Sequence, residues 1–313
     1  MIKVIDLDIE DDGFEESVIG LGNFDGLHVG HRSIMAEVLK LAKEKNVCSA
    51  VLLFKQHTNE VFPKMPPYYI SSLQDKIDML DEIGIECAYT INFTMEFAQL
   101  TNEGFILDFL RDRVNGQTLV CGTDYTYGKK SKGTVKELYE YQNQGLIDVH
   151  VVDDFFYEGD IVSSTTIRNF ISEGKFEEAT KLLVKPFTMR AKVVHGFKRG
   201  AKLLGFPTAN LETDFSYVLP GDGLYLTLIE VDGKKHKALT SVGTNPTFTD
   251  SKDVKIESYI MDFDQEIYGK EVKLSFIKKT RDQIKFNSSE ELINQMKYDE
   301  IQARKYFEKL ENI

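Results

Sequence analysis

The pattern of apolar residues changes near Lys185, and this change limits the folds open to the chain. Before it, short apolar runs alternate with segments whose apolar residues recur at helical spacing, which predicts a parallel, doubly wound α/β sheet. After it, strand-like runs follow one another with only Gly, Pro, Asn and Asp turns between them, which predicts a small antiparallel β-barrel. We therefore expect two domains, residues 1–184 and 185–313, with a short joint near residues 183–187.

The individual elements expected from these patterns can be placed along the chain. In the first half, strands are predicted at residues 17–21, 47–54, 88–93, 118–122 and 147–152, and helices at residues 73–83, 105–114 and 135–144. In the second half, strands are predicted at residues 188–195, 224–231, 236–242, 255–261 and 272–278. The sequence Ser-Ser-Glu-Glu at residues 288–291 has the pattern of a capping box and predicts a final helix that packs on the barrel.

Charge and cysteine content narrow the class of protein. The 313 residues carry a formal net charge of −12, which argues against non-specific binding to nucleic acid or to an anionic membrane, so any phosphate site must be local. The three cysteines, Cys48, Cys87 and Cys121, show no Cys-x-x-Cys spacing, which indicates buried free thiols in a reducing compartment rather than a zinc site. The N-terminal residues lack the apolar core of a signal peptide and no apolar run is long enough to span a bilayer, so we expect a cytoplasmic protein.

The most informative stretch, residues 21–31, reads Leu-Gly-Asn-Phe-Asp-Gly-Leu-His-Val-Gly-His. It lies between an apolar strand and an amphipathic helix, so it forms a strand-to-helix turn whose outward N–H groups favour phosphate. His28 and His31 place two imidazoles there, and His-x-Gly-His at a helix start is typical of nucleotidylyltransferases, which need hydrogen-bonding groups around phosphoryl oxygens. The alternative is a histidine that caps an ordinary turn. The preceding Gly-Asn-Phe-Asp-Gly makes this alternative the weaker one.

Other segments are expected near this turn because ligands of doubly wound sheets bind beyond the carboxyl ends of the strands. We expect residues 54–57 and 122–128 to converge with it on one cleft. Residues 161–168, Ile-Val-Ser-Ser-Thr-Thr-Ile-Arg, open a helix with hydroxyl groups and an arginine that suit a second anion site. A well-capped surface helix is the alternative and, for this segment taken alone, the favoured one.

The second half contains two candidate sites. Residues 195–210 join a basic, glycine-containing loop to Pro-Thr-Ala-Asn, where Thr208 and Asn210 offer the hard oxygen ligands that suit Mg²⁺. A hairpin loop with a turn-forming asparagine is the alternative. Strand alternation places Glu257 and Tyr259 on the face opposite Ile256, Ser258 and Ile260, and from this pattern alone Glu257 is simply a solvated strand residue.

Three motifs in this order and spacing resemble the bacterial bifunctional riboflavin kinase/FMN adenylyltransferase (FAD synthetase) family. They are Gly-Asn-Phe-Asp-Gly-Leu-His-Val-Gly-His at 22–31, Ser-Ser-Thr-Thr-Ile-Arg at 163–168 and Gly-Phe-Pro-Thr-Ala-Asn at 205–210, and the resemblance extends to residues 122–128, 243–248, 262–269 and 281–286. It implies an N-terminal Rossmann-like adenylyltransferase domain and a C-terminal riboflavin kinase barrel. The kinase would use ATP and Mg²⁺ to convert riboflavin to FMN, and the other domain would join AMP from a second ATP to FMN, releasing pyrophosphate and giving FAD.

The same resemblance implies roles for individual residues. His28 and His31 would stabilise the adenylyl-transfer transition state, Glu257 would be the general base on the ribityl hydroxyl, Thr208 and Asn210 would bind the metal, and Arg281 would lie on the flavin side. The implied nucleotide-binding residues are Gly22, Asn23, Phe24, Asp25, Gly30, Asp124, Ser163, Ser164, Thr165, Arg168, Lys202 and Gly205.

The chain departs from the family pattern at three places. It has Lys-Gln-His-Thr at residues 55–58 where the family has Asp-Pro-His-Pro, Val-Lys-Pro at residues 184–186 where Gly-Arg-Pro is usual, and Gly-Ala-Lys-Leu-Leu-Gly at residues 200–205 where Gly-Arg-x-Leu-Gly is expected. These differences leave two alternatives open. One is a family member in which only the kinase is active, and the other is a regulatory protein that binds flavin nucleotides without catalysis.

Overall fold

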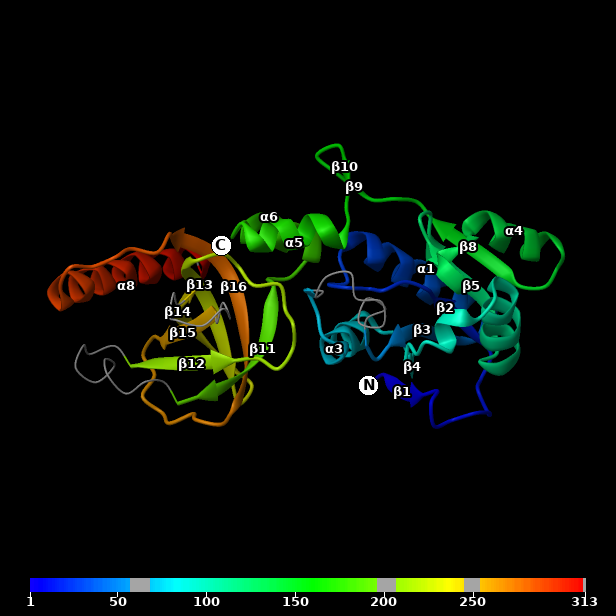
Figure 1. Cartoon of the computed structure of the whole chain (residues 1–313), viewed down its shortest axis with the longest axis horizontal. Coiled ribbons are helices and arrows are strands. Elements are labelled where there is room, and N and C mark those ends of the chain that lie inside the picture. Colours follow the sequence, from blue (N-terminus) through cyan, green and yellow to red (C-terminus); the bar gives the residue numbers. More distant parts are fainter. Residues whose placement is uncertain (57–67, 196–206, 245–253, 312–313) are drawn as a thin grey trace. The chain divides into compact units, whose positions relative to one another are not determined.

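The computed structural model describes residues 1–56, 68–195, 207–244 and 254–311, and these divide into two compact units. The first unit is Met1–Ser164 and the second is Thr165–Ile313. Figure 1 shows the elements of each unit, and the two are described separately below.

The first unit is built on a parallel sheet in the order β1-β4-β3-β2-β5-β8. The strands are β1 (Lys3–Asp6), β2 (Ser17–Gly20), β3 (Cys48–Phe54), β4 (Cys87–Ile91), β5 (Gly116–Gly122) and β8 (Asp148–Val152). The inner strands are almost continuously apolar and buried, as expected of strands covered on both faces. From β2 the chain adds strands first on one side and then on the other, so the topological switch point lies between β2 and β5.

Helices cover both faces of this sheet, which confirms the doubly wound α/β architecture (Figure 1). One face packs against α1 (Val29–Lys45) and α3 (Leu73–Ile83), and the other packs against the π-type helix η2 (Gly104–Arg113) and α4 (Val135–Asn143). The expected capping chemistry is visible at α3, where Ser72 and Asp75 form a reciprocal capping box. The short elements are η1 (Phe97–Gln99), β6 (Thr126–Tyr127), η3 (Lys129–Ser131), β7 (Gly133–Thr134), β9 (Phe156–Tyr157) and β10 (Asp160–Ile161).

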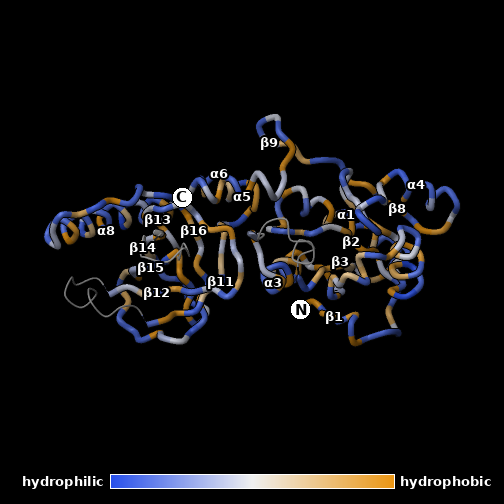
Figure 2. The backbone as a smooth tube through the Cα atoms, viewed as in Figure 1, coloured by the Kyte–Doolittle hydropathy of each residue, from blue (hydrophilic) through white to orange (hydrophobic). Residues whose placement is uncertain are grey.

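The second unit is a closed antiparallel barrel in the order β11-β12-β15-β14-β13-β16. Its strands are β11 (Thr188–Val194), β12 (Thr208–Glu212), β13 (Gly223–Val231), β14 (Lys234–Thr244), β15 (Val254–Ile260) and β16 (Glu271–Arg281). The barrel was expected, whereas β12 was not, because its segment was interpreted as a loop ending in Asn210. The hydropathy of the barrel strands alternates along the chain, as Figure 2 shows for β13 and β16.

Two helices precede the barrel strands, namely α5 (Ser164–Ser172) and α6 (Phe176–Leu183). The ring of Phe176 stacks on Phe276 of β16 with centroids 5.0 Å apart, and the N–H of Gly221 donates to the carbonyl of Ser172. These contacts place both helices with the barrel, so the compact units divide earlier in the chain than residues 184 and 185. The division into functional domains at that point remains a prediction.

The barrel has a polar line through an otherwise apolar interior. The hydroxyl groups of Thr227, Thr240 and Ser258 form a chain with successive oxygen–oxygen distances of 2.7 Å, and all three residues are fully buried. Because each hydroxyl has a partner, the chain carries little of the cost of burying a polar group. The three residues belong to β13, β14 and β15, so the hydroxyl chain joins three neighbouring strands from the inside.

The predicted final helix is α8 (Ser289–Glu311), and it packs on the barrel as expected. Ala303 and Phe307 of the helix are buried against Leu226, Leu239 and Met261 on the outer face of the barrel. At the start of the helix the Ser288 hydroxyl accepts from the N–H of Glu291, whose carboxylate accepts from Asn287 rather than from Ser288 itself. The helix therefore covers one side of β13 and β14.

Candidate functional sites

A cavity of about 590 Å³ opens at the switch point of the parallel sheet. The ends of four strands contribute to its wall, through Gly22 after β2, Phe54 of β3, Gly122 of β5 and Val152 of β8. This is the position at which doubly wound sheets bind their ligands. The expected convergence of residues 21–31 and 122–128 is thus confirmed, and of residues 54–57 only Phe54 lines the cavity while His57 lies outside the described residues.

The two histidines are stacked at the N-terminus of α1. The rings of His28 and His31 lie 3.6 Å apart between centroids with an interplanar angle of 21°. His28 is the N-cap residue, and its Nδ1 accepts a hydrogen bond from the N–H of His31 at 3.4 Å. A ring nitrogen that accepts carries no proton, so a neutral His28 bears its proton on Nε2. Both rings line the cavity, at the end of the helix where the dipole favours an anion.

Burial holds His31 in its neutral form. Desolvation, the neighbouring His28 and the positive charge of Lys76 together place the pKa of His31 well below 6.5. The edge of its ring contacts Phe24, with centroids 5.3 Å apart. Within the part of the chain that the structure describes, the buried Nδ1 of His31 has no hydrogen-bond partner. Such an atom at a cavity wall suits a polar ligand atom.

Phe24 and Asp25 support the turn before α1 and do not line the cavity. Phe24 is fully buried in the core, and a Cβ placed on Gly22 would come within 2.9 Å of its ring, which explains the glycine. The buried carboxylate of Asp25 accepts hydrogen bonds from the N–H groups of Ile70 and Ser71 at 3.0 Å and from the Ser71 hydroxyl at 3.1 Å. The structure thus gives both residues a supporting position, and their contact with nucleotide remains a prediction.

The remaining nucleotide-binding candidates of the first unit lie at the cavity. Its wall includes Gly22, Asn23, Gly30, Asp124, Ser163 and Ser164. The Ser164 hydroxyl donates to the carbonyl of Asp25 at 3.0 Å, which joins this segment to the histidine turn. Lys76 of α3 donates to the carbonyl of Asn23 at 2.7 Å and brings a positive charge to the same turn. Thr165 and Arg168 belong to the second compact unit, so the structure does not add them to this wall.

One side of the cavity is aromatic, and sequence reasoning did not identify it. Its rings belong to Phe54, Phe93, Phe97, Phe105, Tyr125 and Tyr127. They contact one another mainly edge to face, as in the pair Phe54–Phe93, whose centroids are 4.9 Å apart. Phe54 and the two tyrosines fall within segments expected at the cleft, whereas Phe93, Phe97 and Phe105 come from other segments of the chain. The cavity therefore has one polar side and one side suited to a flat ring system.

The barrel brings together a second group of predicted residues on its outer face. In the pairing of β12 with β15, Asn210 lies opposite Glu257, and Glu257 lies opposite Ser241 of β14. Ala209, Leu211, Ile256 and Ser258 are buried on the inner face, so alternation places Thr208, Asn210 and Glu257 on the outer one. A hydroxyl, an amide oxygen and a carboxylate are hard oxygen donors that fit Mg²⁺. Lys202 and Gly205 lie outside the described residues.

Arg281 at the end of β16 is engaged by a buried acid of α8. Its guanidinium donates from Nη2 to the carboxylate of Asp299 at 2.7 Å and from Nε at 3.1 Å, and Asp299 is only 8 % exposed. Nearby, the Gln283 amide donates to the Ser241 hydroxyl and to the carbonyl of Val242, next to the position of Glu257. Arg281 thus ties the barrel to the final helix, and its role toward flavin remains a prediction.

Two kinds of feature are absent from the described ranges. Among these residues, no cluster of three or more His, Cys, Asp or Glu side chains is arranged to hold a metal ion. No helix within them combines the length and the apolar character that crossing a membrane requires.

The fold defines a class of protein: an α/β nucleotidyltransferase-type domain joined to a closed antiparallel barrel. Family models agree with this division, since the model described as FAD synthetase matches residues 11–166 and the model described as riboflavin kinase matches residues 183–307. The chain belongs to the bifunctional riboflavin kinase/FMN adenylyltransferase family and carries both of its domains.

Relatives of that name span almost the whole chain. The proteins from Listeria monocytogenes and Bacillus subtilis are 37% and 35% identical over 297 and 299 residues, and each comparison covers 94% of both sequences. The Escherichia coli protein is 31% identical over 297 residues, which are 94% of this chain and 93% of that one. A crystal structure named Macrolide-efflux Protein from Streptococcus pneumoniae is similar with a TM-score of 0.88 and 33% identity, covering 97% of this chain and 99% of that one.

Proposed function

We propose that this chain makes FAD from riboflavin in two steps at two separate sites. The barrel transfers the γ-phosphate of ATP to the 5′-hydroxyl of riboflavin, and the α/β unit then transfers AMP from a second ATP to FMN with release of pyrophosphate. The observation that carries the proposal is the stacked pair His28–His31 at the start of α1, which faces a cavity with one polar and one aromatic side. This arrangement suits a polyphosphate and a flavin ring together.

Adenylyl transfer needs charge stabilisation rather than covalent chemistry from the protein. The N-terminal N–H groups of α1 and the Nε2–H of His28 would donate to oxygens of the α-phosphate. The buried Nδ1 of His31 gains a partner when a phosphate or its bound water enters the cavity. Asn23, Ser163 and Ser164 would hold the rest of the nucleotide, and the aromatic side would take the isoalloxazine ring of FMN by stacking.

Phosphoryl transfer at the barrel depends on Glu257. Its carboxylate would accept the proton of the ribityl hydroxyl as the γ-phosphate is attacked. Thr208 and Asn210 would hold Mg²⁺ together with the phosphates of ATP, and the register of Asn210 opposite Glu257 supports this role. The metal, when bound, neutralises charge on the transferred phosphoryl group. Arg281 would contribute through the segment that follows it, since its own guanidinium is held by Asp299.

We also propose a cytoplasmic location, which rests on the three cysteines being free thiols.

The experiment that tests the proposal follows both products at once. The purified chain is incubated with riboflavin, ATP and Mg²⁺, and riboflavin, FMN and FAD are separated by chromatography. FMN and then FAD are expected, and EDTA is expected to stop both steps. Accumulation of FMN without FAD, also when FMN is supplied, would leave only the kinase. Binding of flavin nucleotide with neither product would favour the regulatory alternative.

Two variants separate the sites. Glu257→Gln should abolish FMN formation and preserve FAD formation from supplied FMN, with Glu271→Gln on the exposed edge of β16 as its matched control. His31→Ala should do the reverse, and His150→Ala, a partly exposed histidine of the same unit, is its control. Loss of both activities in either variant would contradict the assignment of separate roles.

A further inference from the structure

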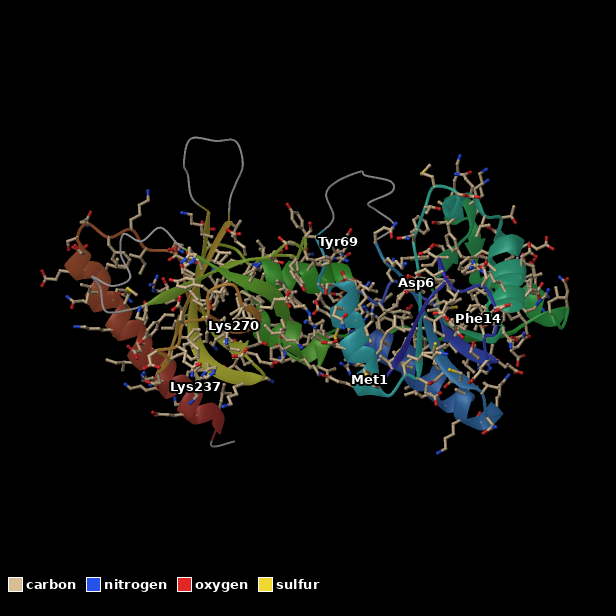
Figure 3. All side chains as sticks on the ribbon, turned by 90° about the horizontal axis from the view of Figure 1, so that it is seen from below. Met1, Asp6, Phe14, Tyr69, Lys237 and Lys270 are labelled. Atoms are coloured by element: carbon tan, nitrogen blue, oxygen red, sulfur yellow. The ribbon has the colours of Figure 1, made fainter. Side chains whose placement is uncertain are left out.

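A second cavity lies at the opposite edge of the parallel sheet from the nucleotide cavity. It has a volume of about 960 Å³ and is lined by the first residues of β3 and β4, including Cys48, Cys87 and Tyr89. Phe14, labelled in Figure 3, forms part of its wall and contacts the edge of Tyr89 with centroids 5.7 Å apart. Lys3 and Glu86 contribute charges to the same wall. The function proposed above uses none of these residues.

Two cysteines that contact each other line this cavity. Cys87 of β4 pairs in register with Ala50 of β3, and Cys48 stands two residues before Ala50, so both thiols project from the same face of adjacent strands. Both pack in the same core cluster, and their side chains share a hydrogen bond. Cys121 lies on β5, which is separated from β3 by β2, and it has no place in this pair.

We propose that Cys48 and Cys87 form an oxidisable dithiol, a modification site at which a hydroperoxide that enters the second cavity converts the two thiols to a disulfide. The proposal rests on the contact between the thiols, on their common cavity and on their unequal exposure. Cys48 is partly exposed and reachable from the cavity, whereas Cys87 is only 3 % exposed.

The environment gives the two thiols different roles. The hydrogen bond from the Cys87 thiol lowers the pKa of Cys48, against the opposing effects of burial and of the Glu86 and Glu15 carboxylates, and Lys3 adds to the lowering. The same hydrogen bond, followed by burial, raises the pKa of Cys87 far above its usual range. Because the thiolate is the reactive form, Cys48 is the attacking sulfur and Cys87 the resolving one.

The reaction balances with the hydroperoxide as the sole oxidant. The Cys48 thiolate attacks one peroxide oxygen, an S–O bond forms, the O–O bond breaks, and hydroxide leaves. The sulfur of Cys87 then attacks the resulting sulfenic acid as its proton passes to that hydroxide, giving water. The S–S bond forms, the S–O bond breaks, and a second hydroxide leaves and takes up the proton that Cys48 released when it ionised. The two sulfurs together lose two electrons, and hydrogen peroxide is reduced to two water molecules.

Cys48 lies diagonally from Cys87, two residues before the in-register partner of Cys87, so strand spacing and rise put the two Cα atoms about 8 Å apart, and the bond requires the strand ends to move closer. A disulfide brings two Cα atoms to about 5.5–6 Å. Cys48 is the first residue of β3 and Cys87 the first of β4, so any adjustment falls on strand ends next to turns rather than on the centre of the sheet.

The test uses the full reduced chain and hydrogen peroxide, and it measures free thiols and peptide masses rather than enzyme activity. After a short exposure to a slight excess of peroxide, free thiols are counted with Ellman's reagent in denaturant, and the protein is digested without reduction for mass spectrometry. We expect two of the three thiols to be lost, a peptide linking Cys48 to Cys87, and full recovery with dithiothreitol. Retention of all three thiols, a bond to Cys121, or Cys48 oxidised to sulfinic acid with Cys87 still free would overturn the proposal.

Single variants strengthen the test and need not be active. Cys121→Ser is the matched control and should lose the same two thiols as the unmodified chain. Cys48→Ser should retain both remaining thiols, and Cys87→Ser should divert Cys48 to sulfenic acid that is trapped by dimedone. In the reduced chain, iodoacetamide should label Cys48 at least about tenfold faster than Cys121, because Cys121 is fully buried and burial raises its pKa.

Discussion

Replacing Asp25 distinguishes a supporting residue from a nucleotide ligand. Its carboxylate is 1 % exposed and accepts from two backbone N–H groups and one hydroxyl, all of Ile70 and Ser71. Asp25→Ala leaves those donors buried without this acceptor, at about 1–2 kcal/mol each. We therefore expect the first unit to lose about 3–5 kcal/mol of unfolding free energy.

Asp25→Asn tests the same geometry more gently. The carboxylate oxygen Oδ1 accepts from all three donors, so an amide oxygen in its place retains them, whereas the amide NH₂ then faces the N–H of Ile70, which is 3.2 Å from Oδ2. We expect a loss of about 1–2 kcal/mol. Asp12→Ala, at an exposed acid of the same unit, should change stability by less than about 0.5 kcal/mol.

Calorimetric unfolding and amide hydrogen exchange measure these effects. Exchange at Ile70 and Ser71 should accelerate by about two orders of magnitude in Asp25→Ala, in line with a loss near 3 kcal/mol. At a temperature where both variants are folded, the Michaelis constant for ATP in FAD formation should change by less than about threefold in Asp25→Asn. The reasoning is refuted if Asp25→Ala is as stable as the parent while its Michaelis constant for ATP rises strongly.

Three further predictions concern other parts of the molecule. Burial, His28 and Lys76 lower the pKa of His31 below 6.5, so as the pH drops the unfolded chain binds the proton before the folded chain does. The free energy of unfolding should therefore fall between about pH 7 and 5, and it should fall less in His31→Gln, as measured by calorimetry at each pH. Asp299→Asn weakens a buried ion pair with Arg281, so thermal scans should show that the unfolding free energy of the second unit falls by about 2–4 kcal/mol. Kinase activity should fall more than adenylyl transfer. Gly128→Ala places a Cβ 2.2 Å from Asn102 Oδ1 at a φ of +69°, and it should cost about 2 kcal/mol more than Gly145→Ala, which has the same φ and an open surrounding.

The fold was predictable where local pattern and tertiary environment agree. The buried strands β3 and β5 contain apolar runs at residues 50–54 and 119–121, and the barrel strands alternate, so both halves were assigned to the right class. Two strands of the main sheet and the barrel were missed for physical reasons. β1 has four residues of which one is buried, and β12 alternates small polar and apolar residues directly after a Gly-Phe-Pro sequence typical of a turn.

The sites were predictable only where chain neighbours are also neighbours in space. His28 and His31 lie one helical turn apart, so their motif already implied a joint role. Asp25 looked like a ligand because its partners, Ile70 and Ser71, are about 45 residues away. Arg281 looked free for the same reason, since no local signal indicates its pairing with Asp299. The aromatic side of the cavity is assembled from separate segments, and spacing alone does not reveal such an assembly.

The buried hydroxyl chain of the barrel has a consequence for how its sequence can change. If β15 slipped by one residue against β14, Ser258 would leave the interior and the carboxylate of Glu257 would enter it without a cation to pair with. The hydroxyl chain thus disfavours a one-residue slip of β15 against β14, which would move Glu257 from the outer face to the interior. Single replacement of Thr240 by valine removes a partner from both Ser258 and Thr227, leaving Thr227 its longer bond to the carbonyl of Ala238 at 3.4 Å. Joint replacement of all three residues by apolar residues of similar size leaves no hydroxyl group without a partner. These three positions are therefore expected to vary together or not at all.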